Sequence, residues 1–258
     1  MKPCRILVCA VLWAAHTAIA VSACSETSDC AVAGGTYRIL EAEKPSGTLI
    51  FAHGYKGSAG QVMRGRLKTF ASKNALNLVA LQSAGDDWAI PNAPTDGNFV
   101  PRDEVAYVKA VFDDLEMRFD LDRSSFVLAG FSAGAMLVST VACRSELTPH
   151  AFVAIAGTAW APMPGACVKN DTRFLHIHGL NDTVVPMAGR PVADAHQGDV
   201  RLFLKTLAAS RPRHAETAFS QPVACDSFET IAGTETYLCL TRDGHGFRPD
   251  YLTVALPG

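Results

Sequence analysis

The stretch LAGFSAGAML, residues 128–137, decides the fold and carries the first candidate for chemistry. It places Ser132 two residues after Gly130 and two residues before Gly134, in a G-x-S-x-G pattern. An apolar run over 126–129 predicts a buried strand before the serine, and a helix is predicted after it. A serine at such a tight strand-to-helix turn is typical of a nucleophile elbow, because small neighbours let the hydroxyl stand above the sheet. The alternative is a simple helix start with Ser132 as its N-cap.

Short apolar runs alternate with helical patterns along the chain. Runs that are apolar throughout indicate strands buried on both faces of a sheet. We expect strands at 48–52, 78–81, 126–129, 151–156, 174–178 and 236–240, and helices at 104–117, 132–142 and 200–209. Strands that alternate with helices imply βαβ crossovers, so we predict an α/β fold with a mainly parallel, doubly wound sheet.

Composition limits the classes of function. The 258 residues are 48% hydrophobic and 19% charged, which is typical of a globular domain with a full-sized core. The formal net charge is -2 and no long run of lysine and arginine occurs, so we expect no nucleic-acid partner. The glycine-containing loop at 53–57 lacks the G-x-x-x-x-G-K-[ST] pattern of a phosphate-binding loop, and we predict no cofactor.

The first residues have the pattern of a secretory signal. Lys2 and Arg5 precede an apolar stretch over 6–20 that ends in Ala-Ile-Ala, which is a small-residue cleavage site. We therefore predict a signal peptide over 1–20 and a single catalytic domain over 21–258. This interpretation places the mature protein outside the cell or in the periplasm.

Membrane attachment is the alternative to a cleaved signal. The apolar stretch is shorter than the about 20 residues that a bilayer requires, and it contains His16, so we expect no stable membrane span. Residues 21–24, Val-Ser-Ala-Cys, are also similar to a bacterial lipobox. A lipid anchor at Cys24 therefore stays open as an alternative.

Six cysteines remain after residue 20, an even number that suggests disulfides in an oxidising compartment. Sequence alone allows about 15 pairings of six cysteines. Our hypothesis joins nearest neighbours: Cys24 with Cys30, Cys143 with Cys167, and Cys225 with Cys239. No pair has the close C-x-x-C spacing of a structural zinc site.

A serine nucleophile needs a base and an acid that orients it, in the chain order serine, acid, histidine. His245 follows the last predicted strand and has Gly244 and Gly246 as neighbours, so we select it as the base. His196 and His214 lie in polar, charge-rich segments and are interpreted as surface residues. Asp182 follows the strand at 174–178 directly, where open α/β sheets place functional side chains, and is our candidate for the acid.

Other residues compete for these roles. Asp243 lies two residues before His245, but neighbouring side chains in a loop rarely face each other. His176 and His178 alternate on one strand and suggest a metal site, yet further ligands are missing nearby, so we predict no metal. For an oxyanion hole we select the backbone amides of Ala133, directly after the serine, and of Tyr55 in the loop after the strand at 48–52.

Several motifs together resemble a known family. They are Cys24 to Cys30 followed by Gly-Thr-Tyr-Arg at 35–38, His-Gly-Tyr at 53–55, Gly-Phe-Ser-Ala-Gly-Ala-Met at 130–136, His-Ile-His-Gly at 176–179 with Asp182 and Val-Pro at 185–186, and Gly-His-Gly at 244–246. In this combination the chain resembles the secreted α/β-hydrolases grouped as polyhydroxybutyrate depolymerase-like and feruloyl esterase-like serine esterases. The resemblance covers nearly the whole of 21–258 and implies a catalytic triad of Ser132, Asp182 and His245.

Two departures from the family narrow the expected substrate. We expect no added polymer-binding domain within the chain, and Phe247 follows the histidine where the family commonly has a tryptophan nearby. Residues 184–210 are the only apparent place for a small cap, so we predict no large lid and an open cleft. Trp88 follows a strand and is either at the rim of that cleft or an anchor of its own loop.

These observations predict an esterase that forms an acyl-enzyme on Ser132 and acts on hydroxycinnamoyl esters or on hydroxyalkanoate oligomers and polyesters. The expected partner is thus a small or oligomeric ester, and sequence does not predict the oligomeric state. Two alternatives stay open. One is an acyltransferase, in which an alcohol replaces water, and the other is a secreted binding protein with an inactive site.

Overall fold

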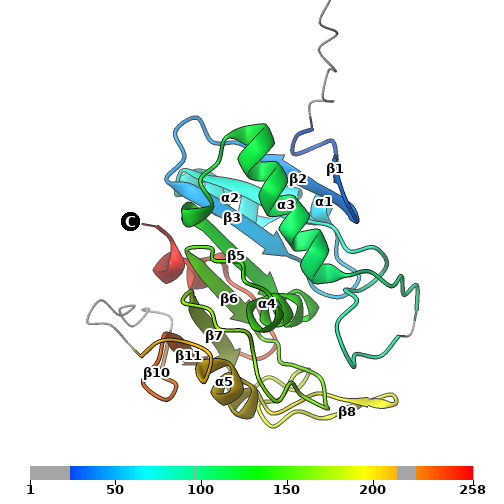
Figure 1. Ribbon diagram of the computed structural model, residues 1–258, viewed down its shortest axis with the longest axis vertical. Coiled ribbons are helices and arrows are strands. Elements are labelled where there is room, and N and C mark those ends of the chain that lie inside the picture. Colours follow the sequence, from blue (N-terminus) through cyan, green and yellow to red (C-terminus); the bar gives the residue numbers. More distant parts are fainter. Residues whose placement is uncertain (1–23, 96, 214–224, 258) are drawn as a thin grey trace, which may run out of the picture.

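A computed structural model describes residues 24–95, 97–213 and 225–257 of the chain. Within these residues a nine-stranded sheet has the order β1-β2-β4-β3-β5-β6-β7-β11-β10 (Figure 1). Its strands are β1 (Cys30–Val32), β2 (Gly35–Leu40), β3 (Gly47–Ala52), β4 (Leu76–Leu81), β5 (Phe126–Phe131), β6 (Ala151–Ile155), β7 (Arg173–Gly179), β10 (Ser227–Thr230) and β11 (Thr236–Thr241). The structure thus has the α/β-hydrolase architecture, a mostly parallel sheet between layers of helices.

The central strands are parallel and the outer ones antiparallel. β4, β3, β5, β6, β7 and β11 pair in parallel, whereas β2 joins β4, β1 joins β2 and β10 joins β11 in the antiparallel sense. All residues of β3, β4, β6 and β11 are buried. The parallel strands end at one edge of the sheet, and the loops that follow them meet there.

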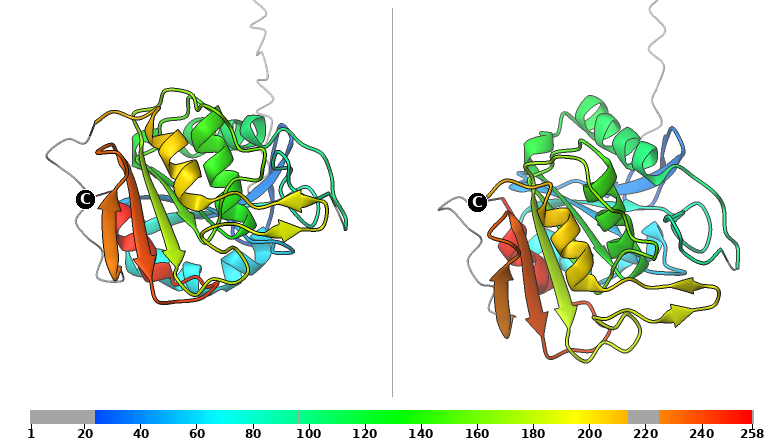
Figure 2. Two further views of the ribbon diagram at one scale, coloured as in Figure 1. Left: turned by 90° about the horizontal axis from the view of Figure 1, so that it is seen from below. Right: turned by 60° about the horizontal axis from the view of Figure 1, so that its bottom comes forward.

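Helices cover both faces of the sheet (Figures 1 and 2). Apolar residues of α3, α4 and α5 belong to the core on one face, and those of α1, α2 and η2 to the core on the other. The helices are α1 (Ala59–Arg64), α2 (Arg66–Lys73), α3 (Glu104–Phe119), α4 (Ala133–Arg144) and α5 (Val200–Ala208), with 3-10 turns η1 (Arg123–Ser125) and η2 (Pro249–Ala255). The two cores explain why the strands read as apolar throughout.

Local signals set the ends of the long helix α3. The Asp103 side chain accepts a hydrogen bond from the Ala106 amide at 3.0 Å and so caps the N-terminus. Val108, Phe112 and Leu115 are completely buried on its inner face. The apolar spacing that predicts this helix therefore also selects the face that packs on the sheet.

A short hairpin leaves the body of the molecule between β7 and α5. It consists of β8 (Pro191–Val192) and β9 (Ala195–His196), which pair in the antiparallel sense. Figure 2 shows it as an arm that projects beside the helices. The segment expected to form a small cap, 184–210, thus forms this hairpin and α5, and no large lid is formed by the described residues.

Three disulfides occur in the part of the chain that the structure describes: Cys24–Cys30, Cys143–Cys167 and Cys225–Cys239. These are the pairs of the nearest-neighbour hypothesis. A disulfide uses Cys24 Sγ, the atom to which a lipid would be attached, so the structure contradicts the alternative of a lipid anchor at Cys24. The predicted signal peptide lies outside the described residues. Among these residues, no helix has the length and apolar character that crossing a membrane requires.

Candidate active site

The G-x-S-x-G motif forms a strained turn between β5 and α4. Ser132 has φ 56° and ψ -119°, a conformation that residues with a side chain rarely adopt. A Cβ on Gly130 would lie 2.3 Å from the carbonyl oxygen of Gly134, and a Cβ on Gly134 would lie 2.1 Å from that of Ala52. Both positions therefore require glycine. Ser132 occupies the N-cap position of α4, but its hydroxyl makes no capping hydrogen bond.

The hydroxyl instead belongs to a chain of three side chains. Ser132 Oγ lies 2.9 Å from His245 Nε2, and His245 Nδ1 lies 2.8 Å from Asp182 Oδ2. A carboxylate can only accept, so Nδ1 carries the proton and Nε2 is left to accept the hydrogen of the serine hydroxyl. The structure therefore brings together the three residues selected from the sequence, in a geometry suited to deprotonating a serine.

Asp182 is buried and fully hydrogen-bonded. Its Oδ1 accepts from the backbone amides of Val184 at 2.9 Å and Val185 at 2.8 Å, while Oδ2 faces His245. The Asp182 side chain is completely buried, whereas the His245 side chain is 16% exposed. A buried charge requires such partners, and here they also fix which way the carboxylate points.

His176 and His178 form a buried pair behind this site. His178 Nε2 donates to the carbonyl oxygen of Val185 at 2.8 Å, so its Nδ1 is an acceptor and receives the Nε2 hydrogen of His176 at 3.0 Å. Burial lowers the pKa of both imidazoles, which keeps them neutral. In the described part of the chain, no group of three or more His, Cys, Asp or Glu side chains is arranged to hold a metal. The pair thus supports the loop that carries Asp182.

The loops that carry Asp182 and His245 are joined. The backbone amide of Asn181 donates to the carbonyl oxygen of Asp243 at 3.1 Å. A Cβ on Gly179 would lie 2.3 Å from that same oxygen, so glycine allows the close approach. The Asp243 carboxylate accepts from the Tyr251 hydroxyl in η2 and does not contact His245. Asp243, the competing candidate for the acid, is therefore hydrogen-bonded to Tyr251 and not to His245.

The loop after β3 packs against the serine turn. A Cβ on Gly54 would lie 3.5 Å from Ser132 Cβ, in ordinary contact. His53 Nδ1 donates to the carbonyl oxygen of Gly54 at 2.8 Å, and its Nε2 accepts from the Ser83 amide at 3.4 Å. Burial lowers the pKa of His53, in agreement with a neutral ring in this arrangement. The loop that holds Tyr55 is consequently fixed beside Ser132.

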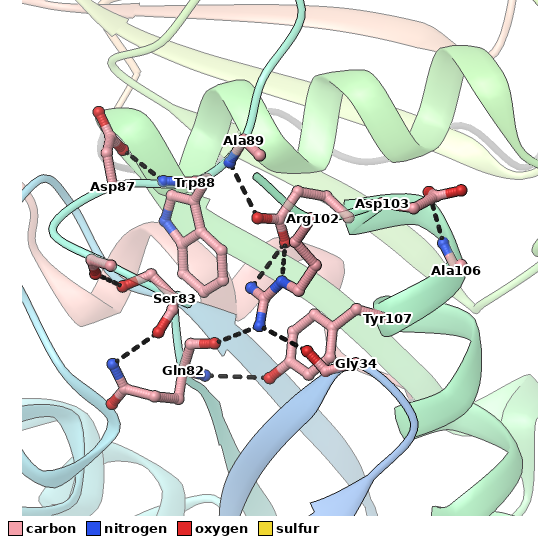
Figure 3. A network of polar contacts seen from close by, with 12 residues as sticks. Gly34, Gln82, Ser83, Asp87, Trp88, Ala89, Arg102, Asp103, Ala106 and Tyr107 are labelled. Atoms are coloured by element: carbon pink, nitrogen blue, oxygen red, sulfur yellow. Dashed lines mark hydrogen bonds and ion pairs between the residues drawn. The ribbon is translucent and has the colours of Figure 1, made fainter. Parts of the chain in front are cut away.

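A buried network of polar contacts around Trp88 and Arg102 packs against this loop (Figure 3). Trp88 is 1% exposed, and its Nε1 donates to the carbonyl oxygen of His53 at 2.8 Å, so it is an anchor rather than a residue of the cleft rim. Arg102 forms a buried ion pair with Glu104 at 2.7 Å and stacks on the Tyr107 ring at 3.8 Å. The residues after β4 thereby support the loop at 53–57.

Two hollows are lined by residues of the serine turn. The first has a volume of about 200 Å³, and Ser132, Ala133, Tyr55, Trp160 and Gln197 are among its lining residues. The amide-bearing residues selected for the oxyanion hole thus share one cavity with the serine. The second hollow, of about 470 Å³, lies over an aromatic floor and shares Tyr55 with the first; that floor consists of Phe51, Phe131 and Phe247.

Several residues of the site are missed by reasoning from sequence. Phe131 lies with its ring centroid 5.0 Å from that of His245 and 6.0 Å from that of Phe247, so it forms a wall beside His245. Trp160 and Gln197 come from segments without a strand or helix signal. The position of Phe131 next to Ser132 in the chain is the only sequence signal that could have indicated its role.

Comparison with known proteins agrees with this arrangement. No model of a protein family matches the chain. The putative esterase NocK of Nocardia uniformis subsp. tsuyamanensis is 29% identical over 147 residues, 55% of this chain and 42% of that protein. A probable feruloyl esterase C of Aspergillus flavus is 26% identical over 155 residues, 57% of this chain and 53% of that protein. The chain thus matches about half the length of these curated relatives.

Solved structures show the same fold. Esterase PE8 matches with a TM-score of 0.58 and 19% identity, over 88% of this chain and 96% of that one. A carboxylesterase from Mesorhizobium loti matches with a TM-score of 0.55 and 19% identity, over 85% of this chain and 92% of that one. The protein therefore has the α/β-hydrolase fold, and its sequence relatives include esterases.

Proposed function

We propose that the protein is a carboxylic ester hydrolase that acts through an acyl-enzyme on Ser132. The observation that carries the proposal is the continuous chain of hydrogen bonds from Ser132 through His245 to Asp182, at 2.9 and 2.8 Å. The strained turn and the esterase relatives support it as well. Strain of this kind is found where a fold presents a reactive group in one orientation.

The mechanism follows from the tautomer of the base. His245 Nε2 takes the proton of the Ser132 hydroxyl as Oγ attacks the ester carbonyl, and a tetrahedral intermediate forms. His245 then passes this proton to the leaving alcohol, which leaves the acyl group on Oγ. Water enters, loses a proton to Nε2 and releases the acid, and the proton returns to the serine. Asp182 stabilises the imidazolium in both halves.

The oxyanion is assigned to two backbone amides. Ala133 begins α4, where the amide hydrogens at the helix N-terminus are free to bind an anion. Tyr55 lies in the loop that His53 and Trp88 hold against the serine turn. Both residues line the cavity that contains Ser132. Two such donors would stabilise the tetrahedral intermediate more than the planar ester.

We propose hydroxycinnamoyl esters or hydroxyalkanoate oligomers as the substrates. A relative named feruloyl esterase and the aromatic and apolar side chains of the cavity, among them Trp160 and Met136, support this choice. We also propose that the protein is secreted after removal of 1–20. The three disulfides support export to an oxidising compartment, and the intact mass of the mature protein tests the cleavage.

Replacement of the serine tests the activity. Ser132→Ala should lower kcat for 4-nitrophenyl butyrate at least about 1,000-fold, because the nucleophile is lost. The matched control is Ser139→Ala, about two turns further along α4, which should retain the wild-type rate. A fluorophosphonate probe should label the wild type and Ser139→Ala, but not Ser132→Ala. Ester hydrolysis that survives in Ser132→Ala, or a wild type that is not labelled, would refute the proposal.

A further inference from the structure

Two residues that line the cavity beside Ser132 carry buried polar atoms whose hydrogen bonds are not made. Trp160 is 7% exposed and Gln197 is 4% exposed, and both line this cavity. Trp160 Nε1 and Gln197 Oε1 have no hydrogen-bond partner among the described residues. Most buried polar groups in proteins are paired, so two unpaired polar atoms on residues that line one cavity point to a partner that enters from outside the chain.

The two side chains come from neighbouring segments whose backbones are paired. Trp160 and Gln197 are opposite each other in an isolated antiparallel bridge, and opposite residues of such a pair point to the same side. The Gly198 amide donates to the carbonyl oxygen of Ala159 at 2.8 Å, and the Gln197 amide donates to that of Arg190 at 2.9 Å. These contacts fix the backbone of Gln197 before any ligand binds.

The chemistry of the two atoms is complementary. An indole nitrogen can only donate a hydrogen bond, and an amide oxygen can only accept one. A hydroxyl group does both, so one hydroxyl can accept from Trp160 Nε1 and donate to Gln197 Oε1. The remaining wall carries apolar side chains, with Met136, Val185 and Val192 among them, together with the charged residues Asp87 and Arg190. It offers a hydrocarbon or aromatic group a surface on which to pack.

We propose that Trp160 and Gln197 form a subsite that selects esters carrying a hydroxyl on the part of the molecule bound in this cavity. The inference rests on the proposed ester hydrolysis at Ser132 and adds the chemical group that the site distinguishes. An ester without the hydroxyl leaves both polar atoms unpaired when it excludes water, and this cost makes such sites selective.

Pairs of esters that differ by one hydroxyl test the subsite in the wild type. The pairs are methyl 4-hydroxycinnamate with methyl cinnamate, and methyl 3-hydroxybutyrate with methyl butyrate. In at least one pair, kcat/KM should be about tenfold or more higher for the hydroxylated ester. Similar kcat/KM values within both pairs would overturn the proposal without any variant.

Two substitutions then locate the selectivity. Gln197→Leu removes the acceptor, and Trp160→Phe removes the donor but keeps an aromatic wall. Each should reduce the ratio of kcat/KM within the preferred pair by about threefold to tenfold or more, corresponding to one hydrogen bond. Trp160 also lines a smaller neighbouring cavity with Ser139, whose hydroxyl is likewise buried without a partner among the described residues. Ser139→Ala is therefore the control, and it should keep the wild-type ratio.

The outcomes separate this inference from the proposed function. Suppose that hydrolysis requires Ser132 but the preference for hydroxylated esters persists in folded Gln197→Leu and Trp160→Phe. This result refutes the subsite and leaves the proposed esterase activity intact. A loss of preference in Ser139→Ala equal to that in Gln197→Leu also refutes it, because the selectivity would then come from general packing. The absence of any hydrolysis that depends on Ser132 refutes the esterase and the subsite together. Far-UV circular dichroism and thermal melting establish that each variant is folded. If only one of Gln197→Leu and Trp160→Phe is folded, that variant alone is sufficient for the test.

Discussion

Replacing Ser132 by glycine should make the protein more stable than replacing it by alanine. Ser132 has φ 56° and ψ -119°, a combination that a residue with a Cβ adopts only under strain. Ser132→Ala removes the hydroxyl but keeps the Cβ, and with it the strain. Ser132→Gly removes both. Both variants lack the Ser132 hydroxyl, so their difference in stability isolates the conformation of the turn.

The expected difference follows from two opposing contributions. Strain at such a backbone position is about 1–3 kcal/mol, and glycine relieves it. Glycine also increases the conformational entropy of the unfolded chain relative to alanine, which costs about 0.4–1 kcal/mol. The net expectation is a free energy of unfolding about 1 kcal/mol higher for Ser132→Gly than for Ser132→Ala. In a domain of this size, that corresponds to a rise in Tm of about 2–4 °C.

Urea unfolding and calorimetry of the two variants measure this difference. Ala142→Gly is the control, because Ala142 is buried inside the regular helix α4. There glycine should lower the free energy of unfolding by at least about 1 kcal/mol, which is the opposite sign. If Ser132→Gly is no more stable than Ser132→Ala while the control behaves as expected, the turn stores no strain and the reasoning is wrong.

Three further predictions concern stability. Burial lowers the pKa of His53 and His178, so below about pH 6.5 the unfolded chain binds protons that the folded protein excludes. The contribution of these two residues to the free energy of unfolding should therefore be constant above about pH 6.5 and fall below it, by up to about 1.4 kcal/mol per pH unit for each excluded proton. Urea titrations from about pH 8 to 5 measure this change. Arg102→Met leaves a buried carboxylate without its cation and should cost about 3–5 kcal/mol in the same titration at pH 7. Replacing Cys143 and Cys167 by alanine opens a link across 24 residues and should cost about 3 kcal/mol, measured without reductant.

Each of these has a contradicting result. A free energy of unfolding that does not change between pH 8 and 5 would show that the buried histidines accept protons without cost. The double variant Arg102→Met with Glu104→Met should recover part of the loss, because no unpaired charge remains, and a loss as large as in the single variant would contradict the ion-pair reasoning. A cysteine double variant as stable as the wild type would mean that the loop stays ordered without its link.

Much of the fold could be predicted because its central strands are buried on both faces. The six expected strands correspond to β3, β4, β5, β6, β7 and β11, and the three expected helices to α3, α4 and α5, with ends that differ by a few residues. Two hydrophobic cores require continuous apolar strands, and such strands are conspicuous in a sequence. The strand ends in turn indicate the loops that supply Ser132, Asp182 and His245.

The elements that were not predicted lack such a pattern. β10 is short and its residues are largely in contact with solvent, so it carries no apolar alternation. α1 and α2 are interrupted at Gly65 after only six residues, too few for a clear helical period. The pairing of Trp160 with Gln197 depends on two irregular segments that meet only in the folded chain. Because no local sequence pattern predicts the contact between Trp160 and Gln197, the walls of the cavity could not be predicted from the sequence.

The outermost strands of the sheet have a consequence for where this chain can be produced. β1 and β10 are the outermost strands of the sheet among the described residues, and each lies beside a disulfide, Cys24–Cys30 and Cys225–Cys239. Exposed strand edges are templates on which other chains add strands and aggregate. In a reducing cytoplasm neither short strand would have its covalent link, and the longer strands β2 and β11 would be more open to such addition. Inclusion bodies are therefore the expected product there, whereas oxidising conditions link both outermost strands covalently to the fold.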